Sequence, residues 1–305
     1  MASSHPLSAA ALFSLKGYVA VVTGGGTGVG LMIAQTLAAN GAKVYITGRR
    51  VDVLETSARI HGSPEKLGPD GGSIVPIAMD VTSKDSINTV VAEIERKHGF
   101  LNVLVNNAGF WGGRPTEKAQ NGPEAFSKAM MAESKDDNWQ RTFEVNVTSQ
   151  YFVTAAFLPL LAKAKSSPTG KLGTVINNSS GSGLLRMTQN CQFSYNASKA
   201  AFNQLTRQMA FEFSHEKIDV RVNGLALGYF PSEMTTGGSG ETNESAPWNE
   251  HFAKFMENLG VPKVKRMGTA EEVASVVLML VTNEFMWGTL TIVDGGFCLT
   301  SPGNM

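Results

Sequence analysis

The stretch "VAVVTGGGTGVG", residues 19–30, decides the fold, because an apolar run rich in β-branched residues breaks into a glycine-rich turn. Such a run is typical of a strand that is buried on both faces. A helical pattern follows and ends at Asn40-Gly41, a pair that favours a helix stop. The start of a helix attracts anions, because its free N–H groups and its dipole point toward the preceding turn. The stretch therefore fits either a phosphate cradle or a tight structural turn.

The order of the glycines excludes two common phosphate motifs. The dinucleotide fingerprint G-x-G-x-x-G, begun at Gly24, meets Val29 where its third glycine is required. The P-loop spacing fails because Leu31 stands where its lysine is required. The pattern that remains is T-G-x-x-x-G-x-G, at Thr23, Gly24, Gly28 and Gly30.

The rest of the chain repeats the alternation of strand and helix. Buried strands separated by helices predict an α/β fold of one domain, with a doubly wound parallel seven-stranded sheet, the Rossmann fold. We expect strands at residues 18–23, 43–47, 73–80, 101–107, 173–180, 218–226 and 289–296. Helical patterns lie near residues 29–40, 52–60, 84–98, 138–165, 194–215 and 270–281.

Residues 15–305 are assigned to that one domain and residues 1–14 to an N-terminal extension. Two connections, residues 110–137 and 228–262, are long for such a domain. The first should include a short helix. The second is polar and glycine-rich but contains aromatic residues, and long loops in compact domains are usually functional or disordered. We interpret it as a mobile substrate lid.

Composition excludes several classes of protein. The chain has 305 residues, 42% of them hydrophobic, a formal net charge of zero and a pI near 7.0, so no basic field would attract nucleic acid or anionic lipid. No segment approaches the roughly 18 uninterrupted apolar residues of a membrane span. The only cysteines, Cys191 and Cys298, suggest a reducing compartment. We expect a cytoplasmic protein with no nucleic-acid or membrane partner and no metal site.

The tip of the second expected strand bears on the kind of ligand. In a dinucleotide site this tip faces the adenosine ribose, where an acidic residue binds the 2′-OH and an arginine accommodates a 2′-phosphate. Here Gly48, Arg49 and Arg50 follow the strand, with no carboxylate. Because a guanidinium binds phosphate in a bidentate manner, they favour NADPH and NADP+ over NADH and NAD+. The alternative is two solvated arginines at a helix start.

A reactive pair is found in "SYNASK", which places Tyr195 and Lys199 one turn apart on one helix face. A free tyrosine has a pKa of about 10 and is a poor acid–base catalyst at neutral pH. A nearby ammonium would stabilise the phenolate and lower that pKa. By itself the same spacing can also occur by chance on a helix surface.

Polar residues follow two other strands, where a parallel sheet opens its ligand crevice. "NNSSGSG", residues 177–183, offers hydroxyl groups, and "VNNAG", residues 105–109, allows close approach of the backbone to a ligand. Asn146 lies inside an expected helix, where amides are poor helix formers. It has either a hydrogen-bonding task or the role of a satisfied buried amide.

The ordered set of motifs resembles the short-chain dehydrogenase/reductase family in its typical single-domain form. It comprises T-G-x-x-x-G-x-G, "NNAG", an Asn in the fourth long helix, Ser, Tyr-x-x-x-Lys and a closing "VDGG". The resemblance runs from about Leu15 to Leu299. Within the family, "GGGTGVGLMIAQ", "YITGRR" and "GYFPSEMT" are similar to fungal ketoreductases that resemble 3-oxoacyl reductases of the rhamnolipid type.

The resemblance implies a role for each residue. Tyr195 would protonate the carbonyl oxygen, and Lys199 would hold the nicotinamide ribose and depress the tyrosine pKa. Asn146 would anchor a water in a proton relay, and a serine would hydrogen-bond the substrate oxygen. The cofactor would be contacted by Gly24, Thr27, Val29 and Gly30 at the pyrophosphate and nearby riboses, Asp80 and Val81 at the adenine, Asn107, Ala108 and Gly109 at the adenosine ribose, and Gly228, Phe230 and Ser232 at the nicotinamide end.

Two positions depart from the family pattern. The usual spacing to the tyrosine selects Ser182 as the serine, whereas counting outward from the strand selects Ser180. We prefer Ser180, because strand register fixes a side chain better than loop length does. The second departure is Leu227, which stands where the family normally has proline before Gly228. Loss of the ring frees the backbone there and would loosen the grip on the cofactor.

The resemblance implies an NADPH-dependent reductase that acts on a small-molecule carbonyl substrate. Aromatic residues in the long connections indicate an apolar, bulky substrate, namely Phe110, Trp111, Trp248 and Phe252, unless they only pack the loops onto the core. Two alternatives are an enzyme that uses the fold for a non-redox cyclisation or isomerisation, and a sensor that binds NADP(H) without turnover. The family pairs the helices that correspond to residues 138–165 and 194–215 between subunits, which implies a homo-oligomer, a dimer or a homotetramer.

Overall fold

A seven-stranded sheet forms the centre of the protein. The structure is a computed structural model, which describes residues 5–133, 138–261 and 263–301. All six strand pairings are parallel, in the order β3-β2-β1-β4-β5-β6-β7. The strands are β1 (Val19–Thr23), β2 (Lys43–Gly48), β3 (Ser73–Ala78), β4 (Val103–Asn106), β5 (Thr174–Asn178), β6 (Arg221–Leu227) and β7 (Leu290–Val293). This confirms the predicted doubly wound fold. Several predicted ranges were longer than the strands by one to three residues at an end, because the composition does not mark where backbone pairing stops.

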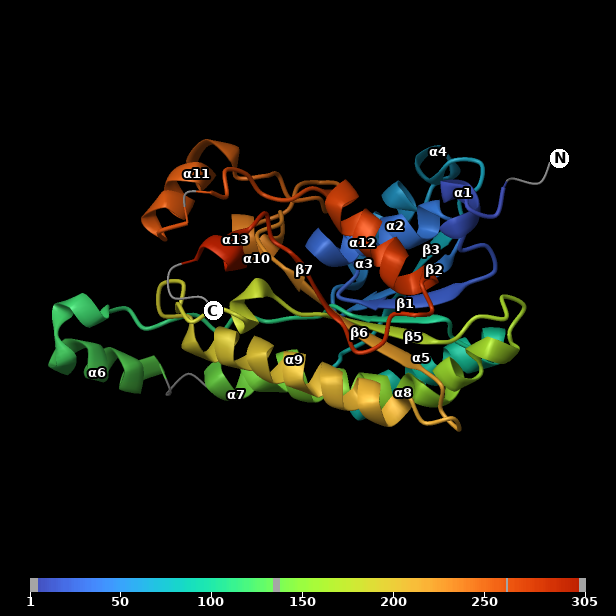
Figure 1. Cartoon of the computed structure of the whole chain (residues 1–305), viewed down its shortest axis with the longest axis horizontal. Helices are drawn as coiled ribbons and strands as arrows, with labels where there is room; N and C mark the ends of the chain where they lie inside the picture. The colour runs from blue at the N-terminus through green and yellow to red at the C-terminus, as the bar shows by residue number, and fades with distance from the viewer. Residues whose placement is uncertain (1–4, 134–137, 262, 302–305) are drawn as a thin grey trace.

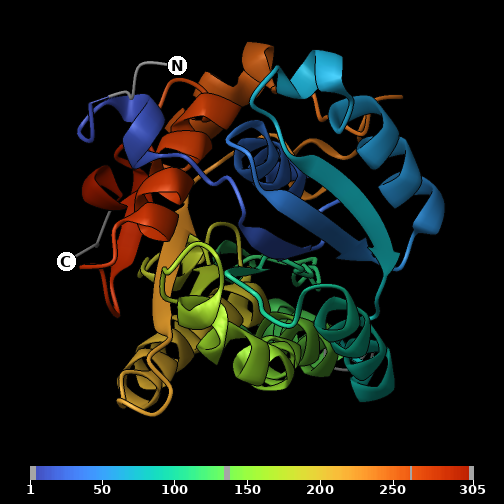
Figure 2. The same cartoon turned by 90° about the vertical axis from the view of Figure 1, so that its right-hand side faces the viewer.

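Helices cover both faces of the sheet (Figures 1 and 2). One face packs on α2 (Gly28–Ala39), α3 (Val51–His61) and α12 (Ala270–Thr282). The other packs on α5 (Lys84–His98), α8 (Ser149–Ala162) and α9 (Phe193–Phe213). The inner strand β1 is buried along its whole length and pairs with β2 and β4. An apolar strand such as "VAVVT" is stable only in this position, where neither face meets water.

The helix predicted at residues 138–165 is interrupted. It consists of α7 (Asn138–Phe143), a π-helical turn (Glu144–Thr148), α8 and a 3-10 turn (Ala164–Ser166). By length and composition alone, the run Asn138–Ser166 could cross a membrane. Core helices of soluble proteins share this length and composition, and α8 packs against α5 and β4. The apolar composition of α8 is therefore explained by its place on the sheet.

The two long connections carry short helices that gather beyond the carboxyl ends of the strands, on the left of Figure 1. The first has a 3-10 turn (Ala119–Asn121) and α6 (Pro123–Glu133), as predicted, and its residues 134–137 lie outside the described residues. The second holds α10 (Glu233–Thr236) and α11 (Asn249–Asn258), with residue 262 outside the description.

The other short elements of the described residues are α1 (Ala9–Leu12), α4 (Pro64–Leu67), α13 (Phe297–Thr300) and a 3-10 turn (Gly181–Gly183). None of the residues of α1 is buried, whereas Leu15 is fully buried in the core. The boundary predicted at residue 15 fits this change, but the division into extension and domain stays a prediction. Residues 1–4 and 302–305, at the two ends of that division, lie outside the described residues.

Candidate active site

The glycine turn joins β1 to α2 at the carboxyl edge of the sheet. Gly24 and Gly28 have φ values of +61° and +51°, a region that favours glycine. A Cβ at Gly30 would lie 2.2 Å from the carbonyl oxygen of Gly24, so no larger residue fits there. The Asn107 side-chain amide donates to the carbonyl oxygens of Thr23 (2.9 Å) and Gly24 (3.0 Å). The turn is therefore held tightly against the end of β4.

A cavity of about 390 Å³ runs along this edge. Its volume is typical of a ligand site, and the glycines of the turn line it. The predicted catalytic residues Ser180, Tyr195 and Lys199 line it, whereas Asn146 is buried behind it. All of the residues predicted to contact a cofactor line the same cavity: Gly24, Thr27, Val29, Gly30, Arg49, Arg50, Asp80, Val81, Asn107, Ala108, Gly109, Tyr195, Lys199, Gly228, Phe230 and Ser232.

The first turns of α9 position Tyr195 and Lys199. The Lys199 ammonium is buried and donates to the carbonyl oxygen of Asn178 at the end of β5 (3.1 Å). Its nitrogen lies 5.7 Å from the centroid of the Tyr195 ring. Asn178 was not identified from the sequence as a partner, because a backbone carbonyl leaves no sequence signal.

Burial controls the acidity of both groups. It raises the pKa of Tyr195 to about 12, while a hydrogen bond from Ser180 acts in the opposite direction. It also lowers the pKa of Lys199 to about 8. The sequence led us to expect that Lys199 would lower the tyrosine pKa. In the structure desolvation outweighs such an effect, and the phenol holds its proton at neutral pH.

The geometry bears on the choice between the two serines. The Ser180 side chain hydrogen-bonds Tyr195, and its oxygen also accepts the backbone N–H of Ser182 (3.1 Å). Ser182 is thereby placed beside Ser180 but has no such bond to the tyrosine among the described contacts. Ser180, the serine that strand register indicated, is thus a hydrogen-bond partner of Tyr195, and its catalytic role stays a prediction.

Asn146 lies in the π-helical turn and hydrogen-bonds its neighbours through both its oxygen and its nitrogen. Its oxygen accepts the backbone N–H of Phe110 (2.7 Å), and its nitrogen donates to the Phe110 carbonyl (2.9 Å) and to Ser198 (3.0 Å). These contacts fix the chain that leaves β4. These hydrogen bonds fit the interpretation of Asn146 as a satisfied buried amide. The second lone pair of its side-chain oxygen has no partner among the described residues, so the predicted water could bind there.

The two arginines after β2 differ in their partners. Arg49 makes no hydrogen bond or ion pair with any described residue, although it lies close enough to lower the pKa of Asp80. Arg50 is bound by both carboxylate oxygens of Glu233, at 3.1 and 2.7 Å. Glu233 also lines the cavity. Nothing in the local sequence signals this pair, since the partners are far apart in the chain.

A second cavity, of about 240 Å³, adjoins the first and shares Ser180 and Tyr195 with it. Trp111 and Trp248, from the two long connections, line it. Of the other aromatic residues proposed as substrate contacts, Phe252 packs under Tyr229 with ring centroids 5.7 Å apart, and Phe110 lines the first cavity. The remaining apolar wall consists of Leu227, Tyr229, Met234, Phe255, Met267 and Phe297.

The backbone at Leu227 is held without proline. Leu227 is the last residue of β6 and pairs with Val293, and the Gly228 N–H donates to the carbonyl oxygen of Val293 (3.0 Å). A Cβ at Gly228 would lie 2.7 Å from the Cα of Asp294. Pairing with β7 therefore restrains the position that we expected the missing ring to loosen.

Metal ligands and cysteine thiols were also part of the sequence prediction. Within the described ranges, no group of three or more His, Cys, Asp or Glu residues could hold a metal ion. Cys191 and Cys298 are both free thiols.

A parallel doubly wound sheet with a glycine turn and a cavity along its carboxyl edge defines a dinucleotide-binding protein of the Rossmann class. The sequence profile of the short chain dehydrogenases matches residues 18–242, and the chain belongs to this family. Members of this family are oxidoreductases that use nicotinamide cofactors.

Individual relatives are similar over nearly the whole chain. Short-chain dehydrogenase/reductase PhomF of Diaporthe leptostromiformis is 36% identical over 312 positions, which cover 98% of this chain and 97% of that protein. The rhamnolipids biosynthesis 3-oxoacyl-(acyl-carrier-protein) reductase of Pseudomonas aeruginosa is 31% identical over 291 positions, 94% and 98% of the two chains. The solved Pseudomonas aeruginosa RhlG/NADP active-site complex has 29% identity and a TM-score of 0.69, with 94% and 98% coverage. The chain is thus of the fungal ketoreductase type within the family.

Proposed function

We propose that the protein is an NADPH-dependent carbonyl reductase that reduces a ketone group of an apolar small molecule. The observation that carries the proposal is the position of Ser180 and Tyr195. Both line the long cavity at the carboxyl edge of the sheet and the aromatic cavity beside it. A carbonyl group at this boundary meets the two hydroxyl groups on one side and has the long cavity on the other.

Tyr195 is the proposed proton donor. Burial keeps its phenol protonated, as a general acid must be, and Ser180 is its hydrogen-bond partner. Both hydroxyl groups then stabilise the negative charge that develops on the carbonyl oxygen. Lys199, whose charge is directed at the Asn178 carbonyl, lowers the energy of the phenolate that remains after the proton leaves.

The long cavity is the proposed cofactor site, and a bound nicotinamide supplies the hydride. The glycine turn lines this cavity with Gly24, Gly28 and Gly30 at the start of α2, and a helix N-terminus fits a pyrophosphate. Arg49 is the proposed partner of the 2′-phosphate, because it has no other ion pair in the described chain. The NADP named in the complex of the related Pseudomonas aeruginosa protein supports this choice of cofactor.

The aromatic cavity is the proposed substrate site. Trp111 and Trp248 form its walls with Tyr229, and Arg114 is a charged residue in the lining. Such walls suit a bulky apolar molecule with few polar groups. We further propose that the protein is cytoplasmic and a homo-oligomer.

The test is turnover of NADPH with a panel of aromatic and aliphatic ketones, followed by the absorbance of the reduced nicotinamide. We expect Tyr195→Phe to lower kcat by about 10²–10⁴-fold while the Kd for NADPH stays within about threefold. The matched control is Tyr151→Phe, at an exposed position on α8, which should retain wild-type turnover.

Other outcomes would select the alternatives. Tight binding of NADPH with no oxidation by any ketone would indicate a sensor. Conversion of a substrate with no net change in the reduced nicotinamide would indicate a non-redox cyclisation or isomerisation. Either result overturns the proposed reductase.

A further inference from the structure

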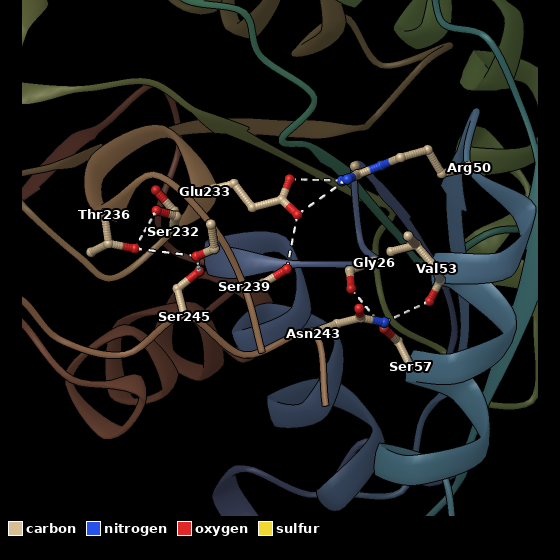
Figure 3. Close-up of polar contacts among 12 residues, drawn as sticks. Gly26, Arg50, Val53, Ser57, Ser232, Glu233, Thr236, Ser239, Asn243 and Ser245 are labelled. Carbon is tan, nitrogen blue, oxygen red and sulfur yellow. Dashed lines mark hydrogen bonds and ion pairs between the residues drawn. The ribbon is translucent and has the colours of Figure 1, made fainter. Parts of the chain in front are cut away.

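Residues 232–245, here called the strap, cross the edge of the long cavity beside the glycine turn (Figure 3). A Cβ at Gly28 would lie 2.8 Å from the Cβ of Ser232, so the strap touches the turn directly. Ser232 caps α10 by accepting the Thr235 N–H, and Ser232 N donates in return to the Thr235 hydroxyl. This capping box fixes Glu233 as the first residue of α10.

The other end of the strap is anchored by Asn243. Its amide donates to the carbonyl oxygen of Val53 (2.9 Å) and to the hydroxyl of Ser57 (2.8 Å), both on α3. Ser57 in turn donates to the carbonyl oxygen of Gly26 in the glycine turn (2.6 Å). Figure 3 shows this chain of contacts beside the pair of Arg50 and Glu233. The strap is therefore held to the wall of the cavity by close packing of Ser232 on the glycine turn and by the hydrogen bonds of Asn243.

The Glu233 carboxylate lies between the tip of β2, where the 2′-phosphate is proposed to bind, and the glycine turn, where the pyrophosphate is proposed to bind. On one side it accepts both terminal nitrogens of Arg50, at 3.1 and 2.7 Å. On the other it hydrogen-bonds the side chain of Thr27, the cap of α2, and it also accepts the Ser239 hydroxyl (2.9 Å). Arg50 holds the pKa of this carboxyl below its usual value, so it is ionised at neutral pH.

A fixed negative charge in this place opposes the binding of an anion. A 2′-phosphate at the tip of β2 would meet one unpaired guanidinium, Arg49, and a second, Arg50, that is already neutralised. The side chains of Arg50 and Glu233 are 57% and 33% exposed, and such pairs contribute little net stability. A phosphate can therefore displace Glu233 from Arg50. The two anchors of the strap keep the displaced carboxylate nearby.

We propose that Glu233 is a cofactor-selecting residue, an internal anion that competes with the 2′-phosphate of NADPH for Arg50 and so narrows the preference for NADPH over NADH. This inference rests on the proposed function, in which the tip of β2 receives that phosphate. It assigns the two arginines different tasks: Arg49 binds the phosphate, and Arg50 is shared between the phosphate and the strap.

The test uses two probes that differ only in the 2′-phosphate, adenosine 2′,5′-bisphosphate and adenosine 5′-monophosphate. Their Kd values are measured by calorimetry at low salt for the wild type, Glu233→Gln and the matched control Glu241→Gln. Glu241 is an exposed residue of the same strap, and its replacement changes the net charge equally. We expect Glu233→Gln to bind the bisphosphate about tenfold more tightly and the monophosphate less than about threefold more tightly, with no change in the control.

The advantage of Glu233→Gln for the bisphosphate should shrink as salt is added, because the competition is between charges near the surface. Unchanged or weaker binding of the bisphosphate by Glu233→Gln overturns the inference, and weaker binding of both probes would show that the pair clamps the ligand in place. If the wild type prefers the bisphosphate and Glu233→Gln leaves that preference unchanged, the inference fails while the proposed cofactor stands. If neither protein prefers the bisphosphate, the proposed cofactor fails as well.

Discussion

Lys199 holds a buried positive charge beside the proposed proton donor. Because burial lowers its pKa to about 8, the ammonium is charged below that pH and loses its proton above it. The phenol of Tyr195, with a pKa raised to about 12, keeps its proton across the same range. We therefore expect kcat/KM for ketone reduction to fall as the pH rises through about 8. A pH profile of initial rates, with folding checked at each pH, measures this.

Lys199→Arg separates this titration from others in the site. A guanidinium keeps its charge well beyond this range, so the fall should move to higher pH even if the rate at neutral pH is lower. The same descending limb in wild type and Lys199→Arg would mean that another group titrates.

Arg49 tests the assignment of the 2′-phosphate at the scale of one side chain. A charge-assisted hydrogen bond to phosphate contributes about 1.5–3 kcal/mol, so Arg49→Ala should raise the Kd for NADPH by about 10- to 100-fold. The Kd for NADH should change by less than about threefold. Arg59→Ala, an exposed arginine on α3, is the control for the loss of charge. Equal effects of Arg49→Ala on both cofactors would contradict the assignment.

The residues of the site were predictable where the chemistry is local in the chain. The spacing of Tyr195 and Lys199 places both on one face of α9, and the glycine pattern fixes the turn after β1, so the sequence alone indicates these groups. The pair of Arg50 and Glu233 was not predictable, since it depends on how α10 folds back over β2. The pKa of Tyr195 was predicted in the wrong direction because burial cannot be read from spacing.

Arg221 joins two elements, the start of β6 and the end of α12. It is fully buried, and its guanidinium donates to the carbonyl oxygens of Leu280 (2.9 Å), Val281 (2.6 Å) and Asn283 (3.1 Å). These carbonyls end the helix and have few other donors. Arg221→Met leaves them unsatisfied in the core, and we expect the free energy of unfolding to fall by about 2–4 kcal/mol.

Denaturant unfolding measures this change. Arg207→Met, at an exposed position of α9, is the matched control and should change stability by less than about 0.5 kcal/mol. Equal losses in the two variants would show that the contacts of Arg221 with α12 contribute nothing specific.

Helices and strands were predictable where buried residues recur at a regular spacing in the sequence. All seven strands were located, because each is an apolar run between glycine or polar stretches, and α5 has the predicted bounds of residues 84–98. The π-helical turn around Asn146 was missed, since one extra residue in a helical turn barely changes the periodicity. In residues 228–262, α10 and α11 were not predicted, because short helices in a polar, glycine-rich segment are stabilised by capping and by contacts with the core.

At the scale of the whole molecule, α8 and α9 cover the same face of the sheet (Figure 1), and each exposes a large apolar side chain. Phe211 of α9 is 77% exposed and Tyr151 of α8 is 49% exposed. Side chains of this size gain free energy when a second copy covers them, at about 25 cal/mol for each Å² of apolar surface. Their exposure supports the proposed homo-oligomer.

Charge at these positions tests the assembly. We expect the wild type to sediment as a dimer or tetramer, and the double variant Tyr151→Asp, Phe211→Asp to sediment as a smaller species, because assembly would bury two unpaired carboxylates. The control is Leu7→Asp, at an exposed apolar position of the N-terminal extension, which should keep the wild-type mass. Far-ultraviolet circular dichroism checks that each variant is folded. A wild type that sediments as a single chain contradicts the proposed oligomer, and a double variant of unchanged mass places the interface on another face.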